Sequence, residues 1–403
     1  MAPAPLRILH VVPYYEQAWA YGGIPRLAST MTQALARRGH AVSVCATDVR
    51  DAASRATLRS SNCGGVDVRL FPNLSNALAY HLQFFTPVGL RRHLRQTVQS
   101  VDIAHLHACH NLPGTIAASE LIRAGIPYVV SPNGTAPALE RHIVAKRLFA
   151  ATLGRRVLDH AGRVVAVSDA EARQLAGLGL DRRAIACVPN PLDDREFERP
   201  ADGARFRRRF GLGERPVVLF LGKLTPRKGV ADLVRAFSAL DTPDALLAIA
   251  GNDMGAGAGV EEVIRTLRLG PRVLRTGLLT GAERLDALAA ANVVAYPSRH
   301  EIFGLVPLEA LMCGTPVVVC NDSGCGEVIG KTGGGLLVPP GDPDALAQAL
   351  STVLGDGSSW RERAAAAGRT ARRLFGSSVV CRQLEELYSS VLDEWQSRQR
   401  RRA

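Results

Sequence analysis

Aromatic side chains are scarce in this sequence: Phe, Trp and Tyr make up 5% of its 403 residues. A core of ordinary packing density must therefore be built mainly from Ala, Val, Leu and Ile. No apolar run approaches the roughly 18 to 20 residues that span a bilayer, so we expect no transmembrane helix. The first five residues contain no basic leader and no cleavage site, so we also expect no signal peptide.

Paired cysteines are missing as well. The eight cysteines are scattered, and no two of them form a CxxC pair. We therefore expect reduced and mostly buried thiols in a cytoplasmic protein. The spacings of Cys313, Cys320 and Cys325 match no common zinc-ligand pattern, so these residues do not predict a metal site.

Negative charge is in deficit, since 49 Lys and Arg residues face 37 Asp and Glu residues, a net charge of +12. Such a balance suits an anionic partner, which can be a nucleic acid, an acidic lipid or a phosphorylated ligand. Helix-turn-helix patterns, aromatic–basic RNA motifs and zinc-finger spacings are all missing, so we expect no nucleic-acid partner. Much of the excess lies at 205–209 and 398–402, runs typical of solvated helix faces and chain ends.

Short apolar runs alternate with helical segments along the whole chain, a pattern typical of parallel sheets covered by helices on both faces. The expected strands are Leu6–Val12, Ala41–Thr47, Ile103–His107, Tyr128–Ser131, Val164–Val167, Pro216–Leu221, Leu246–Ala250, Val293–Tyr296 and Pro316–Val319. The strand–loop–helix pattern that opens the chain restarts at Pro216. The sequence therefore predicts two tandem, doubly wound α/β domains.

We place the domain boundary in the polar stretch that follows Pro191. The prediction is an N-terminal domain over 1–192, a C-terminal domain over 193–376 and a last helix with a basic tail over 377–403. Apolar residues recur at helical spacing in this last helix, so it needs a surface to cover. We expect it to cross back to the N-terminal domain.

Two glutamates frame the most specific motif of the chain. Glu301 lies in the loop after the strand Val293–Tyr296, and Glu309 lies one to two turns into the next helix. Ligands bind beyond the carboxyl ends of parallel strands, and backbone N–H groups at a helix start suit a phosphate. The alternative is an acidic cap on a buried helix.

A second candidate motif follows the apolar strand Pro216–Leu221. Its loop, 222–229, carries Lys223 and Lys228 just before a helix. Cations at such a junction can clamp a diphosphate. The alternative is an exposed turn with solvated lysines.

Taken together, these motifs resemble those of the retaining glycosyltransferases of family 4. The likeness extends to Ser168-Asp169, to Pro189-Asn190-Pro191 and to the segments 314–318 and 324–328, and so covers nearly the whole chain. It implies the GT-B fold, in which two Rossmann-like domains face each other. The N-terminal domain then binds the acceptor and the C-terminal domain binds the nucleotide sugar.

The activity implied by the resemblance is that of a retaining hexosyltransferase. Such an enzyme moves a sugar from a nucleotide-diphosphate sugar onto a glycan or lipid-linked acceptor, in polysaccharide or glycoconjugate biosynthesis. Two alternatives stay open: a nucleotide-sugar 2-epimerase, which needs no acceptor, and a catalytically silent nucleotide-, glycan- or nucleic-acid-binding protein.

The resemblance also implies residue roles in the second half of the chain. Glu309 matches the glutamate that holds the nucleotide ribose, and Glu301 matches the one that positions the donor sugar and takes part in catalysis. Lys228 matches the lysine on the phosphates. Lys223 departs from the family pattern, which usually has Arg, and a lysine lacks the bidentate fork of a guanidinium.

Three consecutive residues complete the implied donor site. Phe303, Gly304 and Leu305 match the backbone segment that meets the sugar and the diphosphate. In the first half of the chain, Gly22 and Gly23 match the Gly-rich loop that approaches the diphosphate, where the missing Cβ lets the backbone come close.

Three histidines, at 105, 107 and 110, lie at the end of the strand Ile103–His107 and in the loop that follows it. His107 fits the family histidine that faces the donor sugar, and His110 is the reserve candidate on the acceptor side, with Asn133 after the strand Tyr128–Ser131. Together with His105, these histidines also look like metal ligands. An extended strand points His105 and His107 the same way without a fourth partner, so we expect no metal.

The chemistry implied by the family needs no bound cofactor. No Asp-x-Asp pair of the metal-binding kind follows an expected strand, because the nearest, Asp193-Asp194, lies in the linker. We expect lysines and helix N-termini to stabilise the leaving diphosphate in place of a metal.

The segment Tyr80–Val98 interleaves large apolar residues with arginines. It indicates an interfacial element that binds an anionic membrane, which would place the protein on the inner face of the cytoplasmic membrane. The alternative is a helix that begins near Pro87, packs into the core and leaves its arginines in water.

Overall fold

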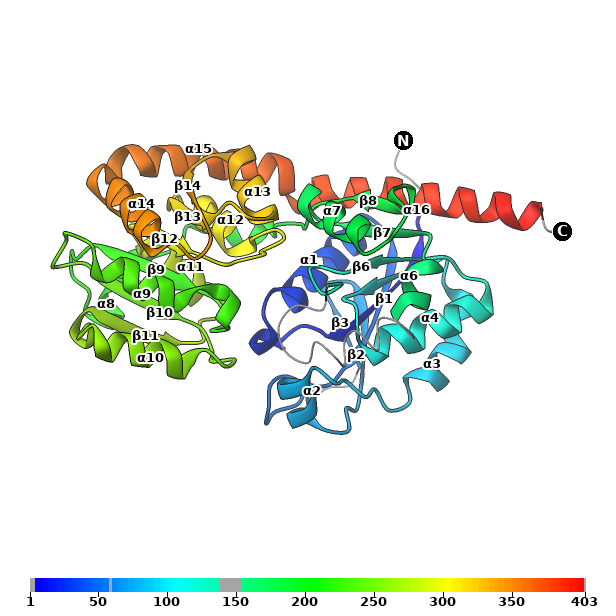
Figure 1. The fold of residues 1–403 in the computed structure, drawn as a ribbon. Helices are drawn as coiled ribbons and strands as arrows, with labels where there is room; N and C mark the ends of the chain where they lie inside the picture. The colour runs from blue at the N-terminus through cyan, green and yellow to red at the C-terminus, as the bar shows by residue number, and fades with distance from the viewer. Residues whose placement is uncertain (1–3, 58–59, 138–153, 402–403) are drawn as a thin grey trace. The chain divides into compact units, whose positions relative to one another are not determined.

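The structure is a computed structural model that describes residues 4–57, 60–137 and 154–401. The chain divides into two compact units (Figure 1). Unit 1 comprises Met1–Pro191 and Ser377–Ala403, and unit 2 comprises Leu192–Gly376.

Unit 1 is built on an eight-stranded sheet in the order β3-β4-β2-β1-β5-β6-β7-β8. Only the edge pair β3–β4 is antiparallel, and every other neighbouring pair is parallel. The strands are β1 (Arg7–Tyr14), β2 (Ala41–Thr47), β3 (Ser60–Cys63), β4 (Val66–Phe71), β5 (Ile103–His107), β6 (Tyr128–Ser131), β7 (Arg163–Ala166) and β8 (Ile185–Cys187). The direction of strand order reverses between β1 and β5, so their loops open at a topological switch point.

Helices cover both faces of this sheet (Figure 1). They are α1 (Gly23–Arg37), α2 (Asn76–Leu82), α3 (Leu90–Thr97), α4 (Leu112–Ala124), α6 (Arg155–Asp159), α7 (Asp169–Gly177) and α16 (Ser377–Arg400). Alternate residues of a strand pack into the hydrophobic cores on opposite faces of the sheet. Ile8 and Ile103 pack with α1 and α16, whereas Leu9 and Leu106 pack with α3 and α4. This alternation follows from the two-residue period of a strand.

The last helix, α16, packs on unit 1 through an apolar stripe that includes Leu384 and Tyr388. Glu385 of this helix accepts hydrogen bonds from Arg38, at 2.7 Å to Oε2, and lies 3.0 Å from Nε2 of His40. Both partners follow α1, so the C-terminal helix is bound to the first helix by charge as well as by apolar packing.

Unit 2 has a six-stranded, wholly parallel sheet in the order β11-β10-β9-β12-β13-β14. The strands are β9 (Val217–Leu221), β10 (Leu246–Ala250), β11 (Val273–Gly277), β12 (Val293–Tyr296), β13 (Val317–Cys320) and β14 (Gly335–Val338). Counted within the unit, this is the Rossmann order 3-2-1-4-5-6, with its switch point between β9 and β12.

The helices of unit 2 lie on both faces of its sheet (Figure 1). They are α8 (Gly203–Phe210), α9 (Val230–Ser238), α10 (Gly257–Thr266), α11 (Gly281–Ala290), α12 (Leu305–Met312), α13 (Gly324–Thr332), α14 (Pro343–Gly355) and α15 (Gly357–Phe375). The predicted pair of doubly wound α/β domains is confirmed. Within the described residues, no helix is both long enough and apolar enough to cross a membrane.

Candidate functional site

The loops that follow β9 and β12 meet at the switch point of unit 2. The loop after β9 forms a short 3₁₀ turn, Pro226–Lys228, and ends at Gly229. Gly229 has φ +65°, and a Cβ on it would lie 2.4 Å from the carbonyl oxygen of Pro297. Glycine is therefore required here, because it lets the two loops come into direct backbone contact.

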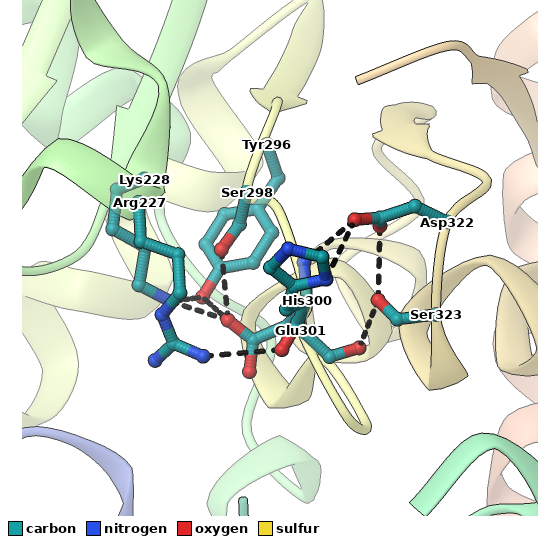
Figure 2. Close-up of polar contacts among 8 residues, drawn as sticks. All are labelled: Arg227, Lys228, Tyr296, Ser298, His300, Glu301, Asp322 and Ser323. Carbon is teal, nitrogen blue, oxygen red and sulfur yellow. Dashed lines mark hydrogen bonds and ion pairs between the residues drawn. The ribbon is translucent and has the colours of Figure 1, made fainter. Parts of the chain in front are cut away.

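This contact brings Lys228 to Glu301, from loops 73 residues apart in the sequence. The Lys228 ammonium donates to Oε2 of Glu301 at 2.5 Å and also bonds the hydroxyl of Tyr296 (Figure 2). Ser298 Oγ donates to the same carboxylate oxygen at 3.0 Å, and the Tyr296 hydroxyl lies 3.2 Å from it. The Lys228 side chain is 8% exposed and that of Glu301 is 16% exposed.

Glu301 is held in its charged form. Burial by itself would raise the pKa of its carboxyl group, but Lys228 and Arg227, with the hydrogen bond from Ser298, lower the pKa to about 2. A carboxylate that accepts charge-assisted hydrogen bonds and stays ionised at pH 7 is suited to bind hydroxyl groups or a developing positive charge.

Acid should remove the stability that Glu301 contributes. Its pKa is about 2 in the folded protein against a reference value of 4.5, so the contribution is complete above pH 4.5 and is lost as the pH falls from 4.5 towards 2. The shift corresponds to about 3 kcal/mol at most. We expect the difference in melting temperature between the wild type and Glu301→Gln to narrow from pH 6 to pH 3.5. An unchanged difference would contradict this linkage.

The segment after Glu301 leads into α12. Phe303 is buried and packs edge-to-face on Phe375, with ring centroids 5.3 Å apart. Gly304 is the N-cap with φ +81°, and a Cβ there would lie 2.4 Å from Sγ of Cys325. Leu305 is the first helical residue, so its N–H and that of Val306 have no partner within the helix. The backbone, rather than the Phe303 side chain, is what this segment offers to an anion.

Glu309 lies within α12 and forms a buried ion pair that the sequence did not indicate. Arg284 of α11 donates through Nη1 to Oε2 of Glu309 and through Nη2 to Oε2 of Glu196 at 2.6 Å. The side chains of Arg284 and Glu309 are 5% and 2% exposed. Arg284 therefore orients the Glu309 carboxylate. Position 284 falls in an ordinary amphipathic helix, so no sequence pattern distinguished it.

Two further candidates are placed by the loops themselves. Lys223 lies two residues after β9 and is half-buried. In unit 1, Gly22 (φ +96°) is the N-cap of α1 and Gly23 is its first residue, in the loop after β1. Both loops thus lie at the switch point of their own unit.

His107 ends β5 and belongs to a cluster of three fully buried histidines. Its Nε2 lies 2.9 Å from Nδ1 of His10 on β1, and its ring stacks on His105 with centroids 4.4 Å apart. Nδ1 and Nε2 of His105 each lie 2.7 Å from a hydroxyl, of Tyr388 and Ser131 respectively. Burial lowers the pKa of His107 to about 3 and, with the neighbouring imidazoles, lowers those of His10 and His105 well below their ordinary range.

Nitrogens of these three side chains come within 4.8 Å of one another, but their arrangement is poor for chelation. A metal ion lies in the plane of each imidazole that binds it, whereas the rings of His105 and His107 are only 12° from parallel and are stacked. Both nitrogens of His105 also already have hydroxyl partners. The cluster is therefore best described as a neutral hydrogen-bonded network that includes the C-terminal helix.

His110 and Asn133, the candidates for the acceptor side, lie in loops after β5 and β6. Both adopt left-handed conformations, with φ +55° and +51°. His110 lines a largely apolar cavity of about 430 Å³, together with Asn111, Thr115 and several leucines. Next to Asn133, the N–H of Gly134 donates to buried Glu171 at 2.6 Å. Burial raises the pKa of Glu171 to about 7, although this N–H and that of Val167 oppose the shift.

Comparison with known proteins assigns the chain to a family of enzymes. A family model described as Glycosyl transferases group 1 matches residues 204–373, and one described as Glycosyltransferase Family 4 matches residues 21–196. The D-inositol 3-phosphate glycosyltransferase of Kineococcus radiotolerans is 32% identical over 339 residues, which cover 77% of this chain and 76% of that protein. The chain belongs to glycosyltransferase family 4 and is a glycosyltransferase.

Other relatives agree with this assignment. The 2-deoxystreptamine N-acetyl-D-glucosaminyltransferase of Streptomyces fradiae is 30% identical over 302 residues, which cover 72% of this chain and 71% of that enzyme. Because these relatives are named as transferases, neither the epimerase alternative nor the binding-protein alternatives are favoured.

Solved structures show the same fold. HepE of Anabaena, in complex with UDP and glucose, has a TM-score of 0.76 at 21% identity and covers 96% of this chain and 100% of its own. Sucrose-phosphate synthase of Thermosynechococcus elongatus also has a TM-score of 0.76 at 21% identity, with 96% and 99% covered. The predicted GT-B architecture of two Rossmann-like domains is thereby confirmed.

Proposed function

We propose that this glycosyltransferase is a retaining hexosyltransferase that uses a nucleotide-diphosphate sugar as donor, bound at the switch point of unit 2. The observation that carries the proposal is the buried Lys228–Glu301 pair at the junction of the β9 and β12 loops. A phosphate of the ligand would be a second anionic partner for Lys228, besides Glu301. Sugar hydroxyls would donate further hydrogen bonds to the Glu301 carboxylate. HepE, a structural neighbour, binds UDP and glucose, which supports this class of donor.

In the proposed reaction the bond between the anomeric carbon and the diphosphate oxygen breaks, and the electron pair leaves with the diphosphate. The acceptor hydroxyl oxygen forms the new bond on the same face of the sugar, and its proton passes to the departing phosphate oxygen. Lys228, Lys223 and the N–H groups of Leu305 and Val306 stabilise the negative charge that develops there. Glu301 orients the sugar, which becomes positively charged in the transition state.

These cations replace a metal ion in the proposal, and Glu309 holds the nucleotide ribose. Unit 1 binds the acceptor, with His110 and Asn133 as the candidate residues on that side. The acceptor is a glycan or a lipid-linked glycan. Since relatives are named for action on D-inositol 3-phosphate and 2-deoxystreptamine, these two compounds belong in any acceptor panel.

The proposal is tested by a panel of UDP-, GDP-, ADP- and TDP-sugars. We expect one sugar nucleotide to raise the melting temperature and to be consumed slowly by hydrolysis, and faster once the acceptor is present. Retention is read from the anomeric proton coupling of the product. If no nucleotide and no sugar nucleotide binds, the donor-site proposal is wrong.

We also propose that unit 1 binds an anionic membrane, although not through the whole of the predicted segment. Leu90 and Leu94 of α3 are 1% and 0% exposed, so the apolar side of that helix is core. Five apolar side chains before it are exposed: Leu74 (73%), Leu78 (43%), Leu82 (45%), Phe84 (51%) and Val88 (49%). The arginines of α3 next to them in the chain are also exposed, a combination suited to an anionic lipid surface.

Vesicle binding tests this surface. We expect the wild type to sediment with phosphatidylglycerol vesicles at low salt, and the double variant Leu78→Ser/Phe84→Ser to bind roughly tenfold more weakly, since two large apolar groups no longer enter the lipid. Hydrolysis of the soluble donor should be unaffected in this variant. Equal sedimentation of both proteins, or none with the wild type, would contradict the proposal.

A further inference from the structure

The residue that precedes Glu301 has a strained backbone. His300 has φ +53°, in the left-handed region that residues other than glycine rarely adopt. Its imidazole is 56% exposed, so side-chain packing in the core does not explain the conformation. Strain of this kind persists only where neighbouring groups hold it, and it gathers at functional sites.

Asp322, in the turn after β13, holds this conformation from one side (Figure 2). Its Oδ2 accepts a hydrogen bond from the backbone N–H of His300 at 2.8 Å and lies 3.4 Å from the imidazole Nδ1. Its Oδ1 lies 3.0 Å from Oγ of Ser323, and that hydroxyl donates to the carbonyl of Glu301 at 2.9 Å. The Asp322 side chain is only 13% exposed, so water competes weakly for these bonds.

Two further hydrogen bonds hold the carbonyls of this loop. Arg227, the neighbour of Lys228, donates to the carbonyl of His300 at 3.1 Å, and the N–H of Cys325 donates to the carbonyl of Glu301 at 2.7 Å. With both carbonyls and the His300 N–H fixed, the left-handed turn at His300 directs the Glu301 carboxylate towards Lys228 and Ser298.

We propose that Asp322 is a positioning residue that keeps His300 in its left-handed conformation and so holds the Glu301 carboxylate against Lys228 in the donor site. The proposal rests on the donor-site function argued above. Asp322 itself touches no reacting atom in this scheme. Without it, the backbone at His300 relaxes to a right-handed or extended conformation, and Glu301 turns away from the sugar.

Glycine at position 300 separates this role from a general loss of structure, because glycine adopts the left-handed conformation without strain. With the donor found in the panel, Asp322→Ala should lower kcat 10- to 100-fold while the KM of the donor changes less than threefold, since in the proposed scheme Glu309, and not Glu301, holds the nucleotide ribose. The double variant Asp322→Ala/His300→Gly should regain at least tenfold in kcat where the single variant loses 100-fold. Asp322→Asn, which keeps the acceptor oxygen, should fall between the wild type and Asp322→Ala.

The matched control is Asp342→Ala, which removes an aspartate of the same unit that also accepts a backbone hydrogen bond, from the N–H of Ala345 at the start of α14. It should leave kcat unchanged. An Asp322→Ala variant that is fully active, or one that glycine at 300 does not rescue, would overturn the proposal.

Melting temperatures of the ligand-free variants keep the two proposals distinguishable. Asp322→Ala should melt below the wild type, and adding His300→Gly should raise the melting temperature of that variant, whether or not a donor has been found. If this rescue occurs but no sugar nucleotide binds, the positioning role of Asp322 is supported and the proposed function is wrong. If donor turnover is found but His300→Gly rescues neither the kcat nor the melting temperature of Asp322→Ala, the positioning role of Asp322 is wrong and the proposed function is supported.

Discussion

Replacing Lys228 with alanine is expected to lower kcat/KM for the donor by roughly 10²- to 10³-fold, the usual effect of removing one group that stabilises a developing oxyanion. Lys228 is a cation that the fold brings into the switch point of unit 2, where it bonds Glu301 and Tyr296. Its loss removes charge from the leaving diphosphate. It also removes the charge that does most to lower the pKa of Glu301, so that carboxyl group becomes easier to protonate.

Initial rates of hydrolysis and transfer, measured from pH 5 to pH 9, check this expectation. Lys228→Arg keeps the charge and should retain more activity than Lys228→Ala. Lys331→Ala removes an exposed lysine of α13 in the same unit and should be indistinguishable from the wild type. If Lys228→Ala stays within threefold of the wild type, the diphosphate is not bound at this loop.

Glu309→Gln is expected to weaken nucleotide binding by roughly 10- to 100-fold, because a hydrogen bond to a charged group contributes about 1.5–3 kcal/mol and each 1.4 kcal/mol is a factor of ten. Arg284 holds the Glu309 carboxylate in place. The amide keeps one oxygen for Arg284 but carries no charge, so the ribose hydroxyls lose a charged acceptor. Gln is preferable to Ala here, because truncation would leave Arg284 with an unpaired buried charge towards α12.

Titration calorimetry with UDP, GDP and ADP measures this effect without any knowledge of the sugar. Glu262→Gln is the matched control, since Glu262 pairs with Arg265 on the exposed face of α10. It should bind nucleotide as the wild type does. A Glu309→Gln variant with full affinity and an unchanged melting temperature would show that the ribose is held elsewhere.

Nine of the fourteen strands that the structure describes were predicted from the sequence, with bounds within two residues of those observed. Ile103–His107, Tyr128–Ser131, Leu246–Ala250 and Val293–Tyr296 have the bounds expected from their apolar runs. Strands of a sheet covered on both faces are buried on both sides, so they stand out as continuous apolar segments. The antiparallel edge strand Ser60–Cys63 was not predicted, because its residues are polar and mostly exposed. The other strands that were not predicted are Val66–Phe71, Ile185–Cys187, Val273–Gly277 and Gly335–Val338.

Sequence patterns were less informative for the segment before α3. The apolar residues of Tyr80–Val98 divide between the core, as Leu90 does, and the surface, as Phe84 does. Helical spacing identifies a face but not what that face contacts. The exposed apolar group therefore begins earlier in the chain, at Leu74, than the pattern indicated.

The sequence by itself determined the family, the two α/β domains and the identity of the motifs at the strand ends, because these depend on local runs of residue types and on short spacings. Only the tertiary structure decided which partners those motifs have. Arg284 for Glu309, His10 for His107 and Asp322 for His300 all come from segments distant in the sequence. Such partners leave no local pattern in the sequence, since nothing in the neighbouring residues distinguishes a charged or imidazole side chain that will pair from one that will not. The tertiary fold alone brings the two partners together.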